Sequence, residues 1–209
     1  MKGSNNFDID KVSGEKAENE VSALIMEKCK QGIDHIEFNR VRENGKDYDL
    51  NIFFGSVNDT LLVEVKNDLS SSETGNAAIE TGCRGKDSGI TTTKALYWIY
   101  SIFINGKVNY FLYETEALIN HLWDNRDRFW YTEGGDQWYD GKRNRKCSDL
   151  IIVKSTEMMR IGKNISQETD IFFKKLYQYH YIDLTNTKNA VRYNCLEKIR
   201  ARNKERGII

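Results

Sequence analysis

The chain has 209 residues, of which 39% are hydrophobic and 30% charged, a composition typical of a soluble globular protein rather than a disordered or fibrous one. Its 31 basic and 31 acidic residues give a net charge of zero, so nucleic-acid binding would depend on local basic clusters. No apolar run approaches the roughly 20 residues that cross a bilayer, and the first 13 residues have no signal-peptide stretch. We therefore expect no membrane association and a cytoplasmic location.

The first predicted element is a helix that starts at Gly14. Residues 1–13 are polar and are expected to form a loosely ordered lead-in, with Ser13 as the N-cap of the helix. Gly32 ends the helix. Apolar residues recur within it at three- and four-residue spacing, which predicts one buried face; they are Ala17, Val21, Leu24, Ile25 and Cys29.

Three strands and a shorter fourth one are predicted next. The first covers residues 35–41 and leads to Asn44-Gly45, a tight-turn sequence. The second and third cover residues 47–54 and 60–66, in which apolar residues alternate with polar ones. A short strand follows at residues 77–80.

The spacing changes again near Thr91. Residues 95–102 carry apolar side chains at helical spacing, so a helix opened by the threonines at 91–93 is expected there. The remaining elements are a strand over 108–113, a helix capped by Thr115, a long irregular excursion over 124–148, a strand over 149–154, a short helix capped by Ser155, and helical structure from residue 170 onwards. One α/β domain with a C-terminal extension is the simplest interpretation.

The residues that indicate chemistry lie between Asp49 and Lys66. Side chains two apart on a strand share a face, so Glu64 and Lys66 point together while Val63 and Val65 point into the core. Asp49 faces away from its apolar neighbours and can meet Glu64 and Lys66 if the two strands pair. Two carboxylates that hold Mg²⁺, with a lysine beside them, suit phosphodiester hydrolysis. An ordinary cross-strand charge pair and a turn aspartate are the alternative.

The same residues resemble the signature of the PD-(D/E)xK nuclease superfamily, which includes restriction endonucleases and Holliday junction resolvases. Asp49 is followed after 14 residues by Glu64-Val65-Lys66, and upstream Gly14 is followed four residues later by Glu18, as in that superfamily's first-helix motif. Two further blocks look like those of small nucleases encoded by bacteriophages; they are residues 74–80, TGNAAIE, and 88–92, SGITT. Tyr48 stands where the motif has proline.

The resemblance implies a restriction-endonuclease-like core, a mixed central β-sheet flanked by helices, over residues 14–160, with a helical C-terminal extension over 161–209. It implies a metal-dependent DNA endonuclease that uses Mg²⁺, with Mn²⁺ as a substitute, and a homodimer if the enzyme is resolvase-like. Asp49, Glu64, Glu18 and the Val65 carbonyl would bind metal, and Lys66 would position the attacking water. Asp47 competes with Asp49 for its role, and Glu15 and Glu20 compete with Glu18.

The substrate is left open between branched or junction DNA and linear duplex. If the chain is phage-encoded, it would act in the host cytoplasm. The alternative function is a catalytically inactive protein of the same fold that binds nucleic acid or a host factor.

Two segments outside this motif are candidates for DNA contact. Thr92 and Lys94 lie at the expected helix start, where free N–H groups and hydroxyls suit a phosphate, although an ordinary helix cap explains them equally well. A basic cluster contains Lys142, Arg143 and Arg145 and follows an aromatic stretch at residues 130–139. Such aromatic rings either stack on unpaired bases or form a small core under a loop.

The four cysteines, Cys29, Cys83, Cys147 and Cys195, are far apart and form no C-x-x-C pair. This spacing favours neither a disulfide framework nor a zinc site. We expect reduced thiols that pack inside the fold.

Overall fold

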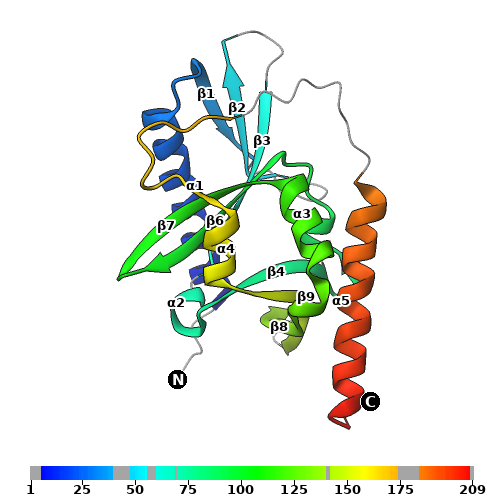
Figure 1. Ribbon diagram of the computed structural model, residues 1–209. Coiled ribbons are helices and arrows are strands. Elements are labelled where there is room, and N and C mark those ends of the chain that lie inside the picture. The colour runs from blue at the N-terminus through cyan, green and yellow to red at the C-terminus, as the bar shows by residue number, and fades with distance from the viewer. Residues whose placement is uncertain are drawn as a thin grey trace.

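Two β-sheets form the centre of the molecule (Figure 1), a computed structural model that describes residues 6–39, 48–55, 60–68, 70–139, 142–173 and 184–207. The first sheet has the order β1-β2-β3-β6-β7-β10, and only the β3–β6 pair is parallel. The sheet is therefore mixed, as expected. Its strands are β1 (Ile33–Phe38), β2 (Leu50–Phe54), β3 (Thr60–Lys66), β6 (Tyr97–Ile104), β7 (Lys107–Glu114) and β10 (Lys163–Asn164).

The second sheet has the order β5-β4-β9-β8 and is antiparallel throughout. Its strands are β4 (Asn76–Cys83), β5 (Lys86–Asp87), β8 (Trp130–Tyr139) and β9 (Lys142–Lys154). The chain between the parallel strands β3 and β6 contributes only β4 and β5 to this sheet, whereas β8 and β9 follow β7. The second sheet lies beside the end of β3, because Lys66 lines one pocket together with Ala78 and Glu80 of β4.

Helices flank both sheets, which confirms the expected α/β class. Figure 1 shows α1 beside the first sheet and α5 running along the other side of the molecule, next to α3. Among the described helices, none is long and apolar enough to cross a membrane. The helices are α1 (Asn6–Lys28), α2 (Ser71–Thr74), α3 (Thr115–Asp124), α4 (Ser155–Ile161) and α5 (Thr185–Glu205), with 3₁₀ turns η1 (Gly89–Thr91) and η2 (Arg126–Arg128).

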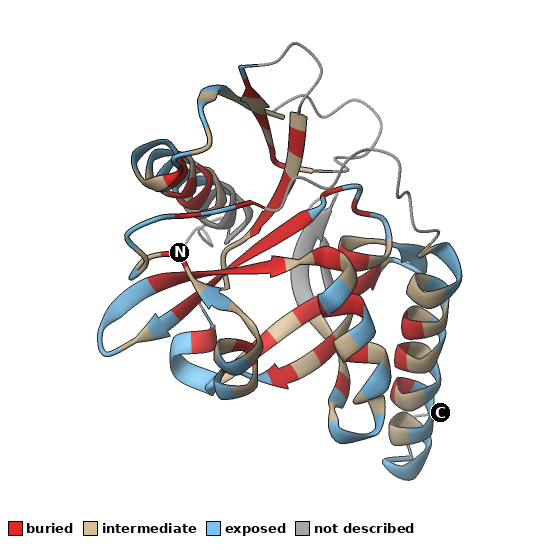
Figure 2. Cartoon of the chain, turned by 45° about the horizontal axis from the view of Figure 1, so that its top comes forward, coloured by how far each residue is buried: buried red, intermediate tan, exposed pale blue. Residues whose placement is uncertain are grey.

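Buried side chains form two apolar clusters, and Figure 2 shows them concentrated on the central strands. One cluster joins α1 to the face of the first sheet that carries Val63 and Val65. The other joins the opposite face of that sheet, which carries Trp98 and Tyr100, to the second sheet, α3 and α5. The two faces of β3 and β6 thus meet different partners.

The described parts of residues 161–209, expected as a helical extension, contribute to both clusters. β10 adds a strand to the first sheet, and Ile165, Ile171 and Phe173 are buried in the α1 cluster. Val191, Cys195 and Ile199 of α5 are buried against the second sheet. These described residues are part of the folded core.

The expected helix over residues 95–102 is wrong, because this segment is strand β6. Every residue from Tyr97 to Ile102 is buried, since the strand lies in the middle of the sheet with clusters on both faces. A strand buried on both faces has no alternation of apolar and polar residues. The apolar run therefore also fits helical spacing.

The irregular excursion expected over residues 124–148 is also wrong. It contains η2 and most of the long β8–β9 hairpin. Glycines and charges within the strands hide their alternation. Smaller corrections concern helix starts: α1 begins at Asn6, so the lead-in is helical from that residue and Ser13 lies inside the helix, and Thr115 and Ser155 are the first residues of α3 and α4 rather than their caps.

Candidate active site

Two buried carboxylates meet where β2 begins and β3 approaches its end. Asp49 precedes β2; its N–H donates to the Val63 carbonyl at 2.9 Å, and its Oδ2 accepts the Val65 N–H at 2.8 Å. Leu50 is the register partner of Val63, so the next pair along is Asp49 with Glu64. Directly opposite side chains share a face and lie close together. The strand pairing on which the predicted juxtaposition depended is confirmed.

Lys66 completes the group from the same face of β3. Its Nζ forms an ion pair with Glu64 Oε1 and lies 5.3 Å from the centre of the Trp98 ring. The Lys66 side chain is 36% exposed, whereas Asp49 and Glu64 are 7% and 6% exposed. The lysine is thus the solvent-facing member of the group, and the carboxylates lie beneath it.

The charge of Lys66 is held by its acidic neighbours. Burial alone would lower the pKa of Lys66, but the charges of Glu64 and Asp49, the hydrogen bond to Glu64 and the charge of Glu80 outweigh burial and raise that pKa above its ordinary value. Lys66 therefore stays a cation through neutral and moderately alkaline pH. It balances part of the negative charge at this end of the sheet.

A pocket of about 220 Å³ opens beside Lys66, between the ends of β3 and β6 and the second sheet. It is a mixed polar and aromatic site in which acidic, basic and indole groups face the same space. The lining residues are Lys66, Asn67, Asp68, Ala78, Glu80, Trp98, Tyr100 and Leu150.

Glu80 is a pocket residue that the sequence argument did not identify, although it ends the TGNAAIE block. Its Oε1 accepts a hydrogen bond from Ser88 at 2.5 Å and its Oε2 one from Ser148 at 2.8 Å. Gly89, at φ +59°, presses against the Glu80 backbone so closely that a Cβ would lie 2.3 Å from the Glu80 carbonyl oxygen. The SGITT block therefore forms the support that fixes Glu80 in the pocket wall.

Asp68 has a structural role on the opposite wall. Its Oδ2 accepts hydrogen bonds from the Tyr100 hydroxyl at 2.5 Å and from the Ala78 N–H at 3.1 Å, and its Oδ1 accepts two from Ser70. Tyr100 has a raised pKa, first through burial and then through the charge of Asp68. This network ties the end of β3 to β4 and β6 and fixes the width of the pocket.

Glu18 is buried on α1, which packs against the opposite face of β3 from Glu64 and Lys66. Among the described residues no group of three or more histidine, cysteine, aspartate or glutamate side chains could hold one metal ion. The structure thus brings Asp49, Glu64 and Lys66 together and does not bring Glu18 into a metal-binding group with them. Of the alternatives, Glu20 accepts a hydrogen bond from Tyr110, and Asp47 lies outside the described residues.

The residues expected at a helix start do not occupy one. Thr92 and Lys94 lie exposed between η1 and β6, and the Thr92 N–H donates to the Gly89 carbonyl at 3.2 Å. No helix N-terminus is available there for a phosphate. Lys142, Arg143 and Arg145 belong to β9, and their side chains lie outside the described residues.

Comparison of the chain with family models, with curated proteins and with solved structures gave no match.

Proposed function

We propose that the chain is a metal-dependent endonuclease that hydrolyses DNA phosphodiester bonds, with Asp49, Glu64 and Lys66 at its active site. The observation that carries this proposal is their convergence on one sheet face, beside an open pocket. Two carboxylates and one ammonium at such a point suit metal-assisted attack on a phosphodiester.

The donor set fits a hard divalent cation. Mg²⁺ is commonly held by only one or two protein carboxylates, with waters and substrate oxygens filling the other positions. Asp49 and Glu64 supply two carboxylates, and the Val65 carbonyl points to the same strand edge as Asp49, because the Val65 N–H donates to that side chain. When bound, the metal would polarise the phosphate and lower the pKa of a water.

The protein's own groups have separable roles. The Val65 N–H fixes the orientation of the Asp49 carboxylate. Lys66, kept cationic by its neighbours, faces the pocket, where it can position a water or stabilise negative charge that develops on the phosphate. Trp98 and Tyr100 form an aromatic wall of the pocket beside the lysine.

The fold and the resemblance support the same proposal. The antiparallel β2–β3 pair followed by the parallel strand β6 forms the mixed sheet that a restriction-endonuclease-like core requires. The two blocks that resemble phage nucleases, residues 74–80 and 88–92, lie on β4 and η1, where they build and support the Glu80 wall. These two blocks and the Asp49–Lys66 segment border the same pocket region, whereas Glu18 of the first-helix motif lies on α1, on the opposite side of β3.

A second candidate function rests on the burial of the carboxylates. With Asp49 and Glu64 covered and Glu64 paired to Lys66, a protein that binds nucleic acid without turnover would present the same group as a structural ion pair. Metal dependence separates the two functions, because only the nuclease requires Mg²⁺.

Cleavage assays test the proposal with Asp49→Asn, Glu64→Gln and Lys66→Met. We expect nicking or cutting of plasmid, linear duplex, single-stranded or four-way-junction DNA only with Mg²⁺ or Mn²⁺, and at least about a 100-fold loss in each variant. Glu27→Gln and Lys30→Met make the same kinds of change at exposed positions on and just after α1 and should cleave normally. Cleavage that survives EDTA, or that Asp49→Asn leaves intact, would disprove this assignment.

A further inference from the structure

The second sheet has an outer face that continues from the pocket to the edge of the molecule. Ala78, Ile152 and Trp130 are register partners across β4, β9 and β8, as are Glu80, Leu150 and Thr132 in the next row. Directly opposite residues share a face, so these six residues define the outer face. The alternating residues Ile79, Ile151 and Tyr131 are buried on the other side.

This register fixes how far Trp130 lies from the candidate active site. Ala78 lines the pocket beside Lys66, and Trp130 is two strands away in the same row. With neighbouring strands about 4.8 Å apart, the backbones of Ala78 and Trp130 are separated by about 10 Å. A nucleic-acid strand of only a few nucleotides can span that distance.

Trp130 is an exposed indole held beside two guanidinium groups. The residue is 52% exposed, with Arg202 Cζ 3.9 Å and Arg206 Cζ 5.9 Å from the ring centre. Arg202 reaches round the edge strand β8 and donates to the Tyr131 carbonyl at 2.8 Å. This bond holds Arg202 over the ring, so the pair is preorganised.

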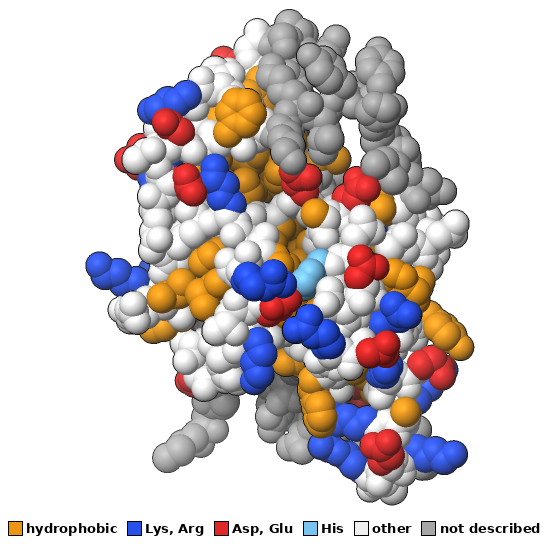
Figure 3. All heavy atoms as spheres, viewed as in Figure 1, with side chains coloured by type: hydrophobic (Ala, Val, Ile, Leu, Met, Phe, Trp, Pro, Cys, Tyr) orange, Lys and Arg blue, Asp and Glu red, His pale blue; other side chains and the backbone are white. Residues whose placement is uncertain are grey.

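Among the described residues, no carboxylate forms an ion pair that balances the positive charge of these two arginines, Arg202 and Arg206. Two other basic residues of α5 do form ion pairs, Lys198 with Asp127 of η2 and Arg200 with Glu197 of α5. Burial and the charge of Arg206 lower the pKa of Arg202, the direction expected for a cation without an anionic partner. Figure 3 shows several Lys and Arg side chains over the lower part of α5, with Asp and Glu side chains among them.

We propose that the outer face binds a single-stranded segment of nucleic acid, with a base stacked on Trp130 and its phosphates on Arg202 and Arg206, and leads that strand toward the pocket at Lys66. Stacking on an exposed ring needs an unpaired base, and guanidinium groups bind phosphate oxygens. The direction of the strand toward Lys66 rests on the proposed nuclease function; the binding surface does not. The substrate class is thus DNA with an unpaired stretch.

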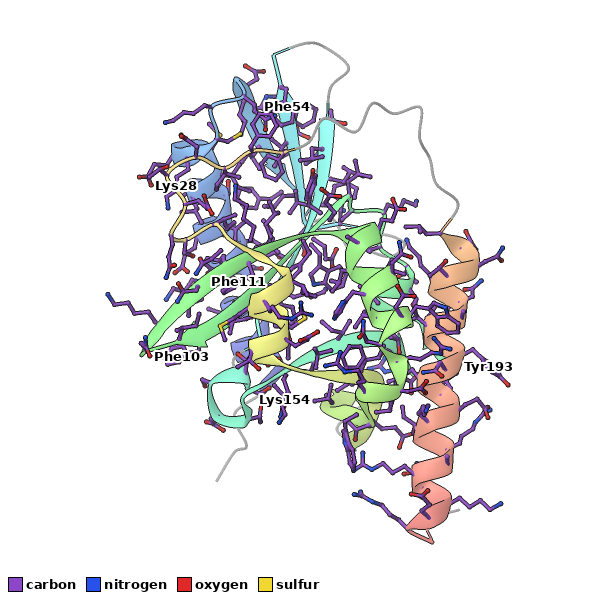
Figure 4. All side chains as sticks on the ribbon, in the orientation of Figure 1. Lys28, Phe54, Phe103, Phe111, Lys154 and Tyr193 are labelled. Atoms are coloured by element: carbon purple, nitrogen blue, oxygen red, sulfur yellow. The ribbon has the colours of Figure 1, made fainter. Side chains whose placement is uncertain are left out.

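Binding of a labelled single-stranded 12-mer, followed by fluorescence anisotropy in EDTA, tests the stacking contact. Trp130→Ala should weaken binding by about 5- to 100-fold and should have much less effect on a fully paired duplex of the same sequence. Tyr193→Ala is the matched control, because Tyr193 is 66% exposed on α5 and points away from the body of the molecule (Figure 4). Equal losses in both variants, or none in Trp130→Ala, would overturn the proposal.

The salt dependence of binding tests the phosphate contacts. Each lost contact to a single strand lowers the slope of log K against log salt by about 0.7, so Arg206→Ala should lower it by about 0.7 and the Arg202→Ala, Arg206→Ala double variant by about 1.4. Arg200→Ala, which removes a paired arginine, should leave the slope unchanged. Thermal unfolding of each variant shows whether the loss of the Arg202 hydrogen bond to β8 affects folding. Arg206→Ala leaves that hydrogen bond in place and therefore tests the phosphate contact alone.

The two proposals fail separately. If the oligonucleotide binds through Trp130 while no DNA is cleaved with Mg²⁺, the binding surface is confirmed and the nuclease function is disproved. If cleavage depends on Asp49 while Trp130→Ala binds as the parent does, the nuclease function holds and the surface is wrong. Failure of the parent protein to bind any single-stranded oligonucleotide also disproves the surface.

Discussion

Gly89→Ala should destabilise the protein by about 3 kcal/mol and distort the pocket wall. Gly89 has φ +59°, a left-handed conformation that costs a residue with a Cβ about 1 kcal/mol. The new methyl group would also lie 2.3 Å from the Glu80 carbonyl oxygen and 2.9 Å from its carbonyl carbon. Backbone atoms of a central strand have to move to relieve this contact, which adds about 2 kcal/mol, as for overpacked sites.

Gly75→Ala separates the two contributions. Gly75 has φ +65°, and a Cβ there would meet nothing within 4 Å, so this variant should lose only about 1 kcal/mol. In urea unfolding the two variants should differ by about 2 kcal/mol, and in thermal unfolding by about 4–8 °C for a chain of this size. Cleavage should fall in the folded Gly89→Ala protein alone, because Glu80 moves with its carbonyl. Unfolding free energies that agree within about 0.5 kcal/mol would refute the proposed support of Glu80.

Three further predictions concern the charged and buried groups. Lys66→Met should cost about 1–2 kcal/mol of stability in urea unfolding, because the change removes the ion pair of the buried Glu64 carboxylate. The cost should be smaller when Glu64→Gln is also present, and equal costs would show that the ion pair is uncoupled from folding. In calorimetric titration, Lys66→Met should bind Mg²⁺ several-fold more tightly, a gain of about 1 kcal/mol in binding free energy, because the Lys66 ammonium no longer competes with the metal for Glu64. Glu64→Gln should bind Mg²⁺ more weakly. Burial raises the pKa of Cys195 from 9.0 to about 11, so this thiol contributes stability below pH 9 that is lost as the pH rises to 11; Cys195→Ala should flatten that decline by up to about 1.4 kcal/mol per pH unit, and an unchanged slope would contradict the shift.

The first three strands were predictable because local patterns determine them. Thr60–Lys66 was predicted with its observed bounds, since one of its faces is apolar and the other carries Glu64 and Lys66. β6 was predicted as a helix because its burial on both faces is a property of the assembled sheet. Residues 149–154 of β9 were predicted as a strand, but β8 and the first part of β9 were missed because glycines and charged residues interrupt their alternation. The sequence alone also does not show that this hairpin lies beside the pocket.

The candidate site likewise contains residues that local sequence patterns predict and residues that they do not. Asp49, Glu64 and Lys66 follow from strand alternation and from the pairing of adjacent strands, both of which are local. Glu80 could not be predicted from the sequence, because its place in the site depends on how β4 of the second sheet packs beside Lys66. That packing is a long-range property of the fold. The pairing of Trp130 with Arg202 joins residues 72 positions apart, at a distance where no spacing in the sequence predicts contact.

The charge around Lys66 favours the proposed nuclease function over nucleic-acid binding without turnover. Three carboxylates, those of Glu64, Asp49 and Glu80, act on this one lysine, so the formal charge of the group is −2. Hydrogen bonds to Asp49 and Glu80 stabilise part of this charge, but the net negative charge repels a phosphate that approaches alone. A module that binds nucleic acid without turnover gains nothing from such repulsion at the head of its binding surface, whereas one divalent cation cancels the charge and makes the same position attractive to a phosphodiester.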